Sequence, residues 1–261
     1  LFNGDENTCG CMTSGGTESI LMACYAYKNI GLQKGITSPE IILPITAHAA
    51  FDKAAEYFGI KLRKIPINFD TYKLNMGFLV SNINNRTIAI VGSAPSFSHG
   101  IVDPLEKMSN IAEDYNIPMH VDACLGGFLL PFIENKGFKY DFDLPGVTSI
   151  SADTHKYGYS PKGSSIILYR NESYFKQQIF VEEDWNGGIY ATPTIMGSKP
   201  GNNIVMTWAT LNYYGFEGYK IRTEKIINTT RIIIDKLREN NDIFIFGEPK
   251  VNVIGIGSHT L

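Results

Sequence analysis

One lysine, Lys156, stands among neighbours that could make it chemically reactive. It follows His155 within residues 149–163, and apolar runs at 147–150 and 165–169 predict a strand on each side of it. Loops at strand ends are frequent places for ligand-binding residues in α/β proteins. A partly desolvated lysine in such a loop can lose its proton and attack an aldehyde to form a Schiff base. A solvated surface lysine is the alternative when this stretch is considered alone.

Two glycines, Gly15 and Gly16, precede a predicted helix. Apolar residues at helical spacing predict that helix over residues 18–27, with Thr17 as its N-cap. The free N–H groups at a helix N-terminus bind phosphate, and glycine lets the backbone approach the ligand closely. A tight turn before the helix would explain the same glycines, so this motif alone leaves both interpretations open.

A carboxylate, Asp122, ends an apolar run that predicts a strand at 119–122. Ligands of open α/β sheets bind beyond the carboxyl ends of the strands, so Asp122 should face a ligand there. A carboxylate in that place can keep a pyridine nitrogen protonated, which makes the ring an electron sink. Capping of the following turn is the structural alternative. His48 follows another predicted strand and should face the same edge, although a lone histidine is more often structural.

The composition suits one large folded domain and excludes several classes of protein. The 261 residues are 44% apolar, which is enough for a sizeable core, and the net charge of -3 without a long basic block argues against nucleic acid as a partner. No apolar run approaches the length of a membrane span, and no signal peptide is recognisable. The four cysteines fit neither a disulfide framework nor a metal site, so no metal is expected; Cys124 lies two residues after Asp122.

Strand and helix patterns alternate along the chain, which predicts an α/β fold with a mostly parallel sheet covered by helices on both faces. Further strands are predicted at 40–45, 61–65 and 87–92, and helices at 48–58, 74–83 and 104–115. Irregular structure is expected at 132–147 and 182–201, a long helix from about 204 to 239 with a break near 215–218, and a strand-like run at 251–256.

Residues 151–165, Ser-Ala-Asp-Thr-His-Lys-Tyr-Gly-Tyr-Ser-Pro-Lys-Gly-Ser-Ser, resemble the cofactor-lysine segment of the sphingosine-1-phosphate lyases. These belong with the pyridoxal-phosphate-dependent group II decarboxylases, which have the fold type I architecture of aspartate aminotransferase. Four more blocks agree in the same order, at residues 13–19, 47–51, 120–127 and 187–191. The resemblance covers essentially the whole chain.

The resemblance implies pyridoxal 5'-phosphate as cofactor and assigns residues to it. The cofactor-binding residues that it implies are Gly15, Gly16, Thr17, His48, Ser93, Asp122, Ala123, His155 and Lys156. Lys156 would carry the cofactor, Asp122 would face the ring nitrogen, and His48 and Ala123 would pack on opposite ring faces. Ser93 and His155 would hydrogen-bond the cofactor, His155 at its phosphate. The catalytic residues would be Lys156, Asp122, His48 and Lys162, although a surface position is the alternative for Lys162.

Some positions are weaker candidates or depart from the family pattern. These are His99, Tyr190, Ser198 and Lys199, of which the last three would lie on a loop that reaches the neighbouring subunit's cofactor. Lys199 stands where an arginine is expected, which exchanges a bidentate fork for a point charge. Ala94, Ser96 and Ser98 also differ from the expected loop, so the substrate contacts expected there are in doubt.

The resemblance implies a lyase that cleaves the C2–C3 bond of a phosphorylated long-chain base in a retro-aldol reaction, giving a fatty aldehyde and phosphoethanolamine. The expected partners are this phosphorylated lipid and a second copy of the chain in a homodimer. An amino-acid decarboxylase with the same cofactor site, and a truncated dimerisation module without activity, are the alternatives.

The whole chain, residues 1–261, is expected to be the cofactor-binding large domain. It would be a fragment that lacks an N-terminal segment and most of a C-terminal small domain. A membrane would be bound only through a segment outside this chain. The expected location is cytoplasm-facing, on the endoplasmic reticulum if the protein is eukaryotic and full-length, and cytoplasmic otherwise.

Overall fold

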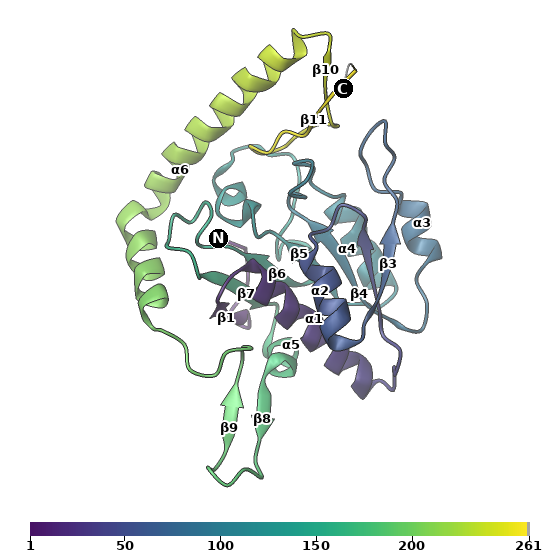
Figure 1. Ribbon diagram of the computed structural model, residues 1–261, viewed down its shortest axis with the longest axis vertical. Coiled ribbons are helices and arrows are strands. Elements are labelled where there is room, and N and C mark those ends of the chain that lie inside the picture. The colour runs from purple at the N-terminus through teal and green to yellow at the C-terminus, as the bar shows by residue number, and fades with distance from the viewer. Residues whose placement is uncertain (260–261) are drawn as a thin grey trace.

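A seven-stranded sheet forms the centre of the computed structural model, which describes residues 1–259 (Figure 1). Its strands are β1 (Cys9–Thr13), β2 (Glu40–Pro44), β3 (Lys61–Ile65), β4 (Thr87–Ser93), β5 (Met119–Asp122), β6 (Val147–Ala152) and β7 (Ser165–Tyr169). Their order across the sheet is β1-β7-β6-β5-β4-β2-β3. Only β7 runs antiparallel to its neighbours, so the expected mostly parallel sheet is confirmed.

Helices cover both faces of this sheet. They are α1 (Gly16–Gln33), α2 (Ala50–Phe58), α3 (Met76–Ser81), α4 (Leu105–Asp114), α5 (Glu172–Phe175) and α6 (Asn202–Arg238), with short 3₁₀ turns η1 (Gly126–Phe128), η2 (Leu130–Phe132) and η3 (Lys176–Gln178). Neighbouring residues of one strand pack into different cores: Ile41 lies in a cluster with α1 and α2, whereas Ile42 lies in one with α4. Because side chains alternate along a strand, a strand buried on both faces needs a continuous apolar run.

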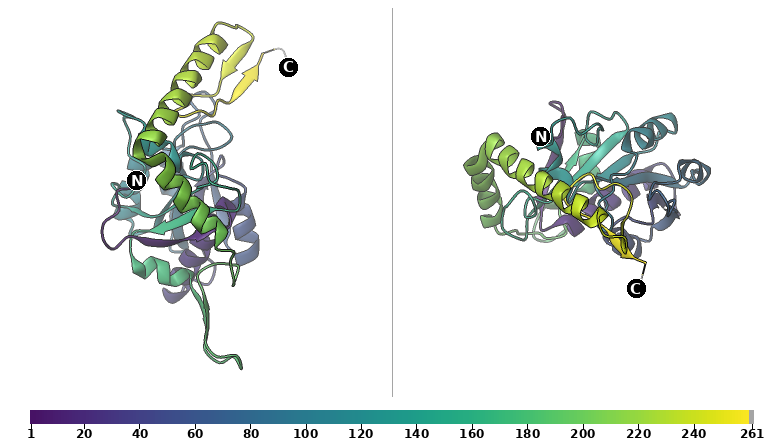
Figure 2. Two further views of the ribbon diagram at one scale, coloured as in Figure 1. Left: turned by 90° about the vertical axis from the view of Figure 1, so that its left-hand side faces the viewer. Right: turned by 90° about the horizontal axis from the view of Figure 1, so that it is seen from above.

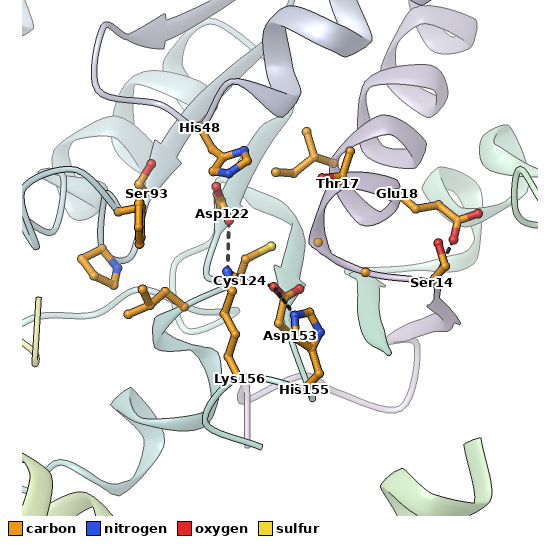
Figure 3. Close-up of a pocket in the computed structure, with 16 residues that line it drawn as sticks. Ser14, Thr17, Glu18, His48, Ser93, Asp122, Cys124, Asp153, His155 and Lys156 are labelled. Carbon is orange, nitrogen blue, oxygen red and sulfur yellow. Dashed lines mark hydrogen bonds and ion pairs between the residues drawn. The ribbon is translucent and has the colours of Figure 1, made fainter. Parts of the chain in front are cut away.

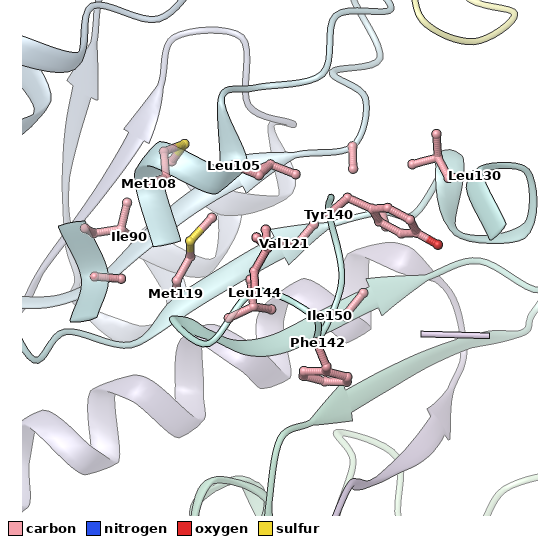
Figure 4. Packing of buried hydrophobic residues seen from close by; sticks show 14 of the residues in the cluster. Ile90, Leu105, Met108, Met119, Val121, Leu130, Tyr140, Phe142, Leu144 and Ile150 are labelled. Carbon is pink, nitrogen blue, oxygen red and sulfur yellow. The ribbon is translucent and has the colours of Figure 1, made fainter. Parts of the chain in front are cut away.

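The cluster on the α4 side joins strand residues to the loop that follows η2 (Figure 4). Val121 and Ile150 contribute from β5 and β6, and Met108 contributes from α4. Tyr140 and Phe142 come from the segment that was expected to be irregular, and both are buried in this core. The segment is irregular in backbone but contributes aromatic side chains that close the edge of the core.

Most predicted elements agree with the observed ones within a few residues, but several differ. Helix α1 extends to Gln33, well beyond the predicted end at 27, and its N-cap is Gly15, which makes no side-chain capping hydrogen bond, and not Thr17. The predicted helix at 74–83 is shorter, and α3 covers only Met76–Ser81. Strand β1 was not predicted. The segment 182–201 contains β9 (Tyr190–Thr192), which pairs with β8 (Phe180–Glu182) as a hairpin. The run at 251–256 is not a strand before Ile256, where β11 (Ile256–Ser258) begins and pairs with β10 (Ile243–Ile245). Short strands such as these depend on a distant partner, which local patterns do not reveal.

Two features project from the body of the molecule. The β8–β9 hairpin extends away from one end, and the second half of α6 carries the β10–β11 ribbon at the other end (Figure 1 and Figure 2). Helix α6 bends at Gly215, whose φ of 55° is not helical, which confirms the break predicted at 215–218. Within residues 1–259, no helix combines the length and the apolar character that crossing a bilayer requires.

Candidate cofactor site

A cavity of about 340 Å³ lies at the carboxyl edge of the sheet (Figure 3). The parallel strands β2, β4, β5 and β6 all end at this edge, so the residues that follow them converge. His48 follows β2, Ser93 ends β4, Asp122 ends β5, and Lys156 follows β6. The N-terminus of α1 closes the cavity from the side. Side chains far apart in the chain therefore meet because the strands are parallel and in register.

Two glycines at the start of α1 form one wall of the cavity. Gly15 has a φ of 156°, which residues with a Cβ rarely adopt. A Cβ on Gly16 would lie 2.7 Å from Asp153 Oδ1 and 2.8 Å from Cys124 Sγ, so no larger residue fits unless these side chains move. The first residues of α1, whose N–H groups have no partner within the helix, line the cavity. A wall of this kind has the donors that a phosphate group needs.

The carboxylate of Glu18 accepts hydrogen bonds from the turn that precedes α1 and from a second segment. Its Oε2 accepts a hydrogen bond from Ser14 N at 2.6 Å, and its Oε1 accepts one from Ile195 N at 2.9 Å. The carboxylate thus holds the glycine turn and also ties it to the segment that follows β9. The sequence prediction did not include Glu18, although an acidic residue in the first turn of a helix is a recognisable signal.

Asp122 is a buried carboxylate on the floor of the cavity. Its Oδ1 accepts hydrogen bonds from Cys124 N at 3.0 Å and from Ser151 Oγ at 3.4 Å, which fix the orientation of the carboxyl group. A second buried carboxyl, that of Asp103, accepts a hydrogen bond from Ser93 N at 2.7 Å. Burial raises the pKa of Asp103 to about 7, and the nearby Asp122 adds to the rise. Asp122 thus lines the cavity, whereas Asp103 lies outside it and accepts the hydrogen bond from the strand end beside it.

Lys156 lines the cavity, and its Nζ is 3.0 Å from Asp153 Oδ2, next to the glycine wall. The side chain of Lys156 is 35% exposed. Its partial burial favours the neutral amine, but the carboxylate of Asp153 opposes this, and the pKa of Lys156 lies above its ordinary value. His155 Nδ1 donates to the carbonyl oxygen of Ser164 at 2.6 Å, which leaves Nε2 facing Asp153 at 3.8 Å. The lysine is therefore held by an ion pair, with an oriented imidazole beside it.

His48 and Ser93 line the opposite side of the cavity (Figure 3). His48 Nδ1 accepts a hydrogen bond from Ala50 N at 3.0 Å, so the proton of a neutral ring is on Nε2. Ser93 Oγ is buried and has no hydrogen-bond partner within residues 1–259, and the same holds for Asp153 Oδ1. Buried polar atoms without partners are uncommon in native proteins. A polar ligand in the cavity would satisfy both of these atoms.

Two of the predicted site residues do not line this cavity. Ala123 is fully buried in the core, so its contact with a ring in the cavity stays a prediction. Lys162 is exposed, and its side chain is not part of the cavity wall. The local context of Lys162 resembled a site segment, but the turn after Ser160 carries this lysine outward into solvent.

The weaker candidates lie in other surroundings. The ring of His99 packs against those of Tyr72 and Phe246, with centroids at 5.3 and 5.4 Å, and these two rings also stack on each other. Lys199 Nζ donates to the carbonyl oxygen of Met12 at 3.0 Å. Tyr190 and Ser198 are exposed on and after the β8–β9 hairpin. None of these four residues lines the cavity, and their roles stay predictions.

Sequence reasoning missed Asp153 as a site residue. It lies three residues before Lys156, inside the predicted lysine loop, and its side chain is only 2% exposed. Cys124 was noted for its position, and it does line the cavity. Burial raises the pKa of the Cys124 thiol well above its ordinary value, so at neutral pH this residue is a neutral thiol. The position of Asp153 in the predicted lysine loop was visible in the sequence. Whether its side chain points toward Lys156 depends on the conformation of the turn, which only the fold determines.

Three kinds of group in the cavity suit three parts of one ligand. Backbone N–H donors at Gly16 suit a phosphate, Lys156 suits an aldehyde carbon, and Asp122 suits a protonated ring nitrogen. This set of groups fits a phosphorylated pyridine aldehyde, and the unpartnered atoms of Ser93 and Asp153 offer further polar contacts. The predicted phosphate, lysine and carboxylate positions are therefore brought together in one cavity.

Comparison with known proteins agrees with this geometry. The chain is 51% identical to "Sphingosine-1-phosphate lyase 1" of Rattus norvegicus, an alignment that covers 99% of this chain and 46% of that protein. A solved sphingosine-1-phosphate lyase of Burkholderia pseudomallei superposes with a TM-score of 0.92 at 39% identity, over 99% of this chain and 60% of that one. A glutamate decarboxylase of Lactobacillus brevis superposes with a TM-score of 0.85 at 26% identity, over 95% of this chain and 60% of that one.

The chain spans about half the length of the curated relatives it matches. A family model described as "Pyridoxal-dependent decarboxylase conserved domain" matches residues 2–256, which is nearly all of the chain. The chain therefore belongs to the pyridoxal-dependent decarboxylase family.

Proposed function

We propose that this chain is the cofactor-binding part of a pyridoxal-phosphate-dependent lyase that cleaves the C2–C3 bond of a phosphorylated long-chain base. The products would be a fatty aldehyde and phosphoethanolamine. The observation that carries this proposal is the 51% identity to a sphingosine-1-phosphate lyase along essentially the whole chain. The cavity by itself supports the cofactor but not the choice of reaction, because decarboxylases need the same electron sink.

Each group in the cavity has a definite task in this proposal. The cofactor, when bound, supplies an electron sink for the pair released by bond cleavage. Lys156 would hold the cofactor covalently and would be displaced from it by the substrate amine. Asp122 would keep a proton on the ring nitrogen, and the N–H groups beside Gly16 would bind the phosphate. The His48 ring would pack on the cofactor ring, and His155 would hydrogen-bond the phosphate.

Lys162 lies outside the cavity that holds the rest of the proposed machinery. Because it is exposed outside the cavity, a direct role requires its side chain to turn toward the substrate. A second ammonium near the cavity mouth would suit an anionic substrate phosphate. We therefore keep Lys162 as a candidate for substrate binding and not for holding the cofactor.

A homodimer is also part of the proposal. Large apolar side chains are exposed on three successive segments, which are the β8–β9 hairpin, the segment after it and the first half of α6. They include Trp185, Ile189, Ile195, Ile204, Val205, Trp208 and Tyr213. Large exposed apolar patches on soluble proteins mark association surfaces. A second copy of the chain is the partner that we propose for this surface, as the dimeric family implies.

Two measurements on the full-length protein test the proposal. Borohydride reduction followed by peptide mapping should place a pyridoxyl label on Lys156, and the exposed Lys162 in the same digest serves as the control. A label on Lys162 with Lys156 unmodified would contradict the assignment. Turnover is then compared between sphingosine 1-phosphate and amino acids such as glutamate. Release of carbon dioxide without aldehyde would favour the decarboxylase, and a labelled protein without either product would favour a module that does not turn over.

A further inference from the structure

Asp153 is a charged group in the cavity that the proposed function does not use. Its Oδ2 lies 3.0 Å from Lys156 Nζ, and its side chain is 2% exposed. Its Oδ1 is buried and has no hydrogen-bond partner within residues 1–259. Since a buried carboxylate is costly unless it is paired, this position needs a physical explanation.

The surrounding backbone fixes Asp153 in this place. Its N–H donates to the carbonyl oxygen of Cys124 at 3.2 Å, which attaches the start of the lysine loop to the segment after β5. On the other side, the missing side chain of Gly16 leaves the space that Asp153 Oδ1 occupies. The carboxylate is thus held between the glycine wall and the lysine, with little freedom to turn away.

Four titratable groups surround the Lys156 amine. Asp153 and His155 belong to its own loop, and Asp122 and Cys124 come from the end of β5 and the segment after it. Cys124 is a neutral thiol at neutral pH, so it contributes no charge there. Asp153 is the group in direct contact with the amine, whereas Asp122 acts only through its charge at a distance.

We propose that Asp153 is a positioning residue for Lys156, which it holds as an ammonium at the glycine end of the cavity until a carbonyl ligand takes the amine. This rests on the proposed role of Lys156 as the cofactor lysine. An ion pair at 3.0 Å fixes the direction of a long and otherwise flexible side chain. Asp153 also sets the pH at which the amine becomes reactive, because only the neutral amine is a nucleophile.

The chemistry of capture shows where this control acts. The ammonium first releases one proton to solvent, and the neutral nitrogen then bonds to the aldehyde carbon. The carbon–oxygen bond breaks, and the oxygen leaves as water with the two remaining amine protons. The carboxylate of Asp153 opposes the first step, which agrees with the raised pKa of Lys156 despite its burial. The side chain of Lys156 is 35% exposed, so solvent screens part of this effect.

The test measures the reactivity of Lys156 without cofactor or substrate. Cofactor-free full-length protein is treated with acetic anhydride across a range of pH, and acetylation of Lys156 is quantified by peptide mass spectrometry. In Asp153→Asn the midpoint should move to lower pH, so that at a pH below both midpoints Lys156 reacts about tenfold faster than in the wild type. Asp141→Asn, which changes a buried aspartate outside the cavity, should leave the midpoint in place.

Two results would overturn the inference. One is an unchanged pH midpoint of Lys156 acetylation in a folded Asp153→Asn protein. This would mean that the Asp153 carboxylate interacts mainly with His155 and not with Lys156. The other needs no variant: a wild-type midpoint below that of Nα-acetyl-lysine amide would mean that burial and not Asp153 controls the amine. Because no cofactor is present, either result leaves the borohydride test of Lys156 as cofactor lysine independent.

Discussion

The lysine loop and the β8–β9 hairpin differ in how their side chains are satisfied. In the lysine loop, Ser160 Oγ lies 2.8 Å from Thr207 Oγ1 of α6, and Tyr219 OH, also on α6, donates to the carbonyl oxygen of Gly158 at 2.6 Å. The hairpin, in contrast, presents Trp185 and Ile189 to solvent. Helix α6 thus provides hydrogen-bond partners for Gly158 and Ser160 of the lysine loop, whereas Trp185 and Ile189 of the hairpin leave most of their apolar surface uncovered.

This difference has a physical meaning for function. A loop that must hold a reactive amine in one direction needs hydrogen bonds from its own chain, because small displacements reduce catalysis strongly. Apolar side chains on a projecting hairpin gain stability only when another surface covers them. We expect changes near the lysine loop to alter chemistry within one subunit, and changes on the hairpin side to alter assembly.

The largest effect should come from the floor of the cavity. Asp122→Asn keeps the shape of the side chain but removes its charge, so it should preserve the fold and reduce turnover by several powers of ten. Steady-state kinetics of the full-length protein and its circular dichroism spectrum measure the two parts of this prediction. Asp141→Asn is the control, since it removes a buried carboxylate outside the cavity. Turnover within a factor of about three of the wild type would show that Asp122 is structural.

An intermediate effect is expected on the exposed apolar surface. The Trp208 residue on α6 is 66% exposed, so Trp208→Asp should cost the monomer little but weaken the proposed dimer by about 2 kcal/mol or more. Analytical ultracentrifugation over a range of concentrations measures the dissociation constant. Phe69→Asp is a matched control, because Phe69 is 69% exposed and lies on neither the hairpin nor α6. If Phe69→Asp dissociates the dimer and Trp208→Asp does not, the interface has been assigned to the wrong surface.

The smallest effect should come from the glycine wall. In Gly16→Ala, the new Cβ would press on Asp153 and Cys124, which should cost about 1–3 kcal/mol of stability and weaken phosphate binding. Thermal unfolding and the cofactor dissociation constant are the measurements. Gly201→Ala is the control, since nothing lies within 4 Å of a Cβ at that position. Equal effects of both substitutions would show that close contact with Asp153 does not explain the glycine.

Much of the architecture follows from patterns that are local in the sequence. The apolar run that became β4 is buried on both faces, so it is nearly continuous and easily recognised, whereas the equally buried β6 contains Thr148, Ser149 and Ser151. The break at Gly215 was predictable because glycine lowers helix stability. Strands β8 and β9 were not predictable, since each has three residues and pairs only because the other is near.

The sequence by itself determined which types of residue form the site and in which order they follow one another along the chain. Gly16, Asp122 and Lys156 could be selected because each follows or precedes an element whose end is recognisable, and the parallel sheet then requires these ends to meet. The antiparallel direction of β7, the outward direction of Lys162 and the contact between Asp153 and Lys156 were decided only by the tertiary structure. The physical reason is that a turn of a few residues sets where a side chain points, and that turn is shaped by packing against α1 and α6, which are distant in the sequence.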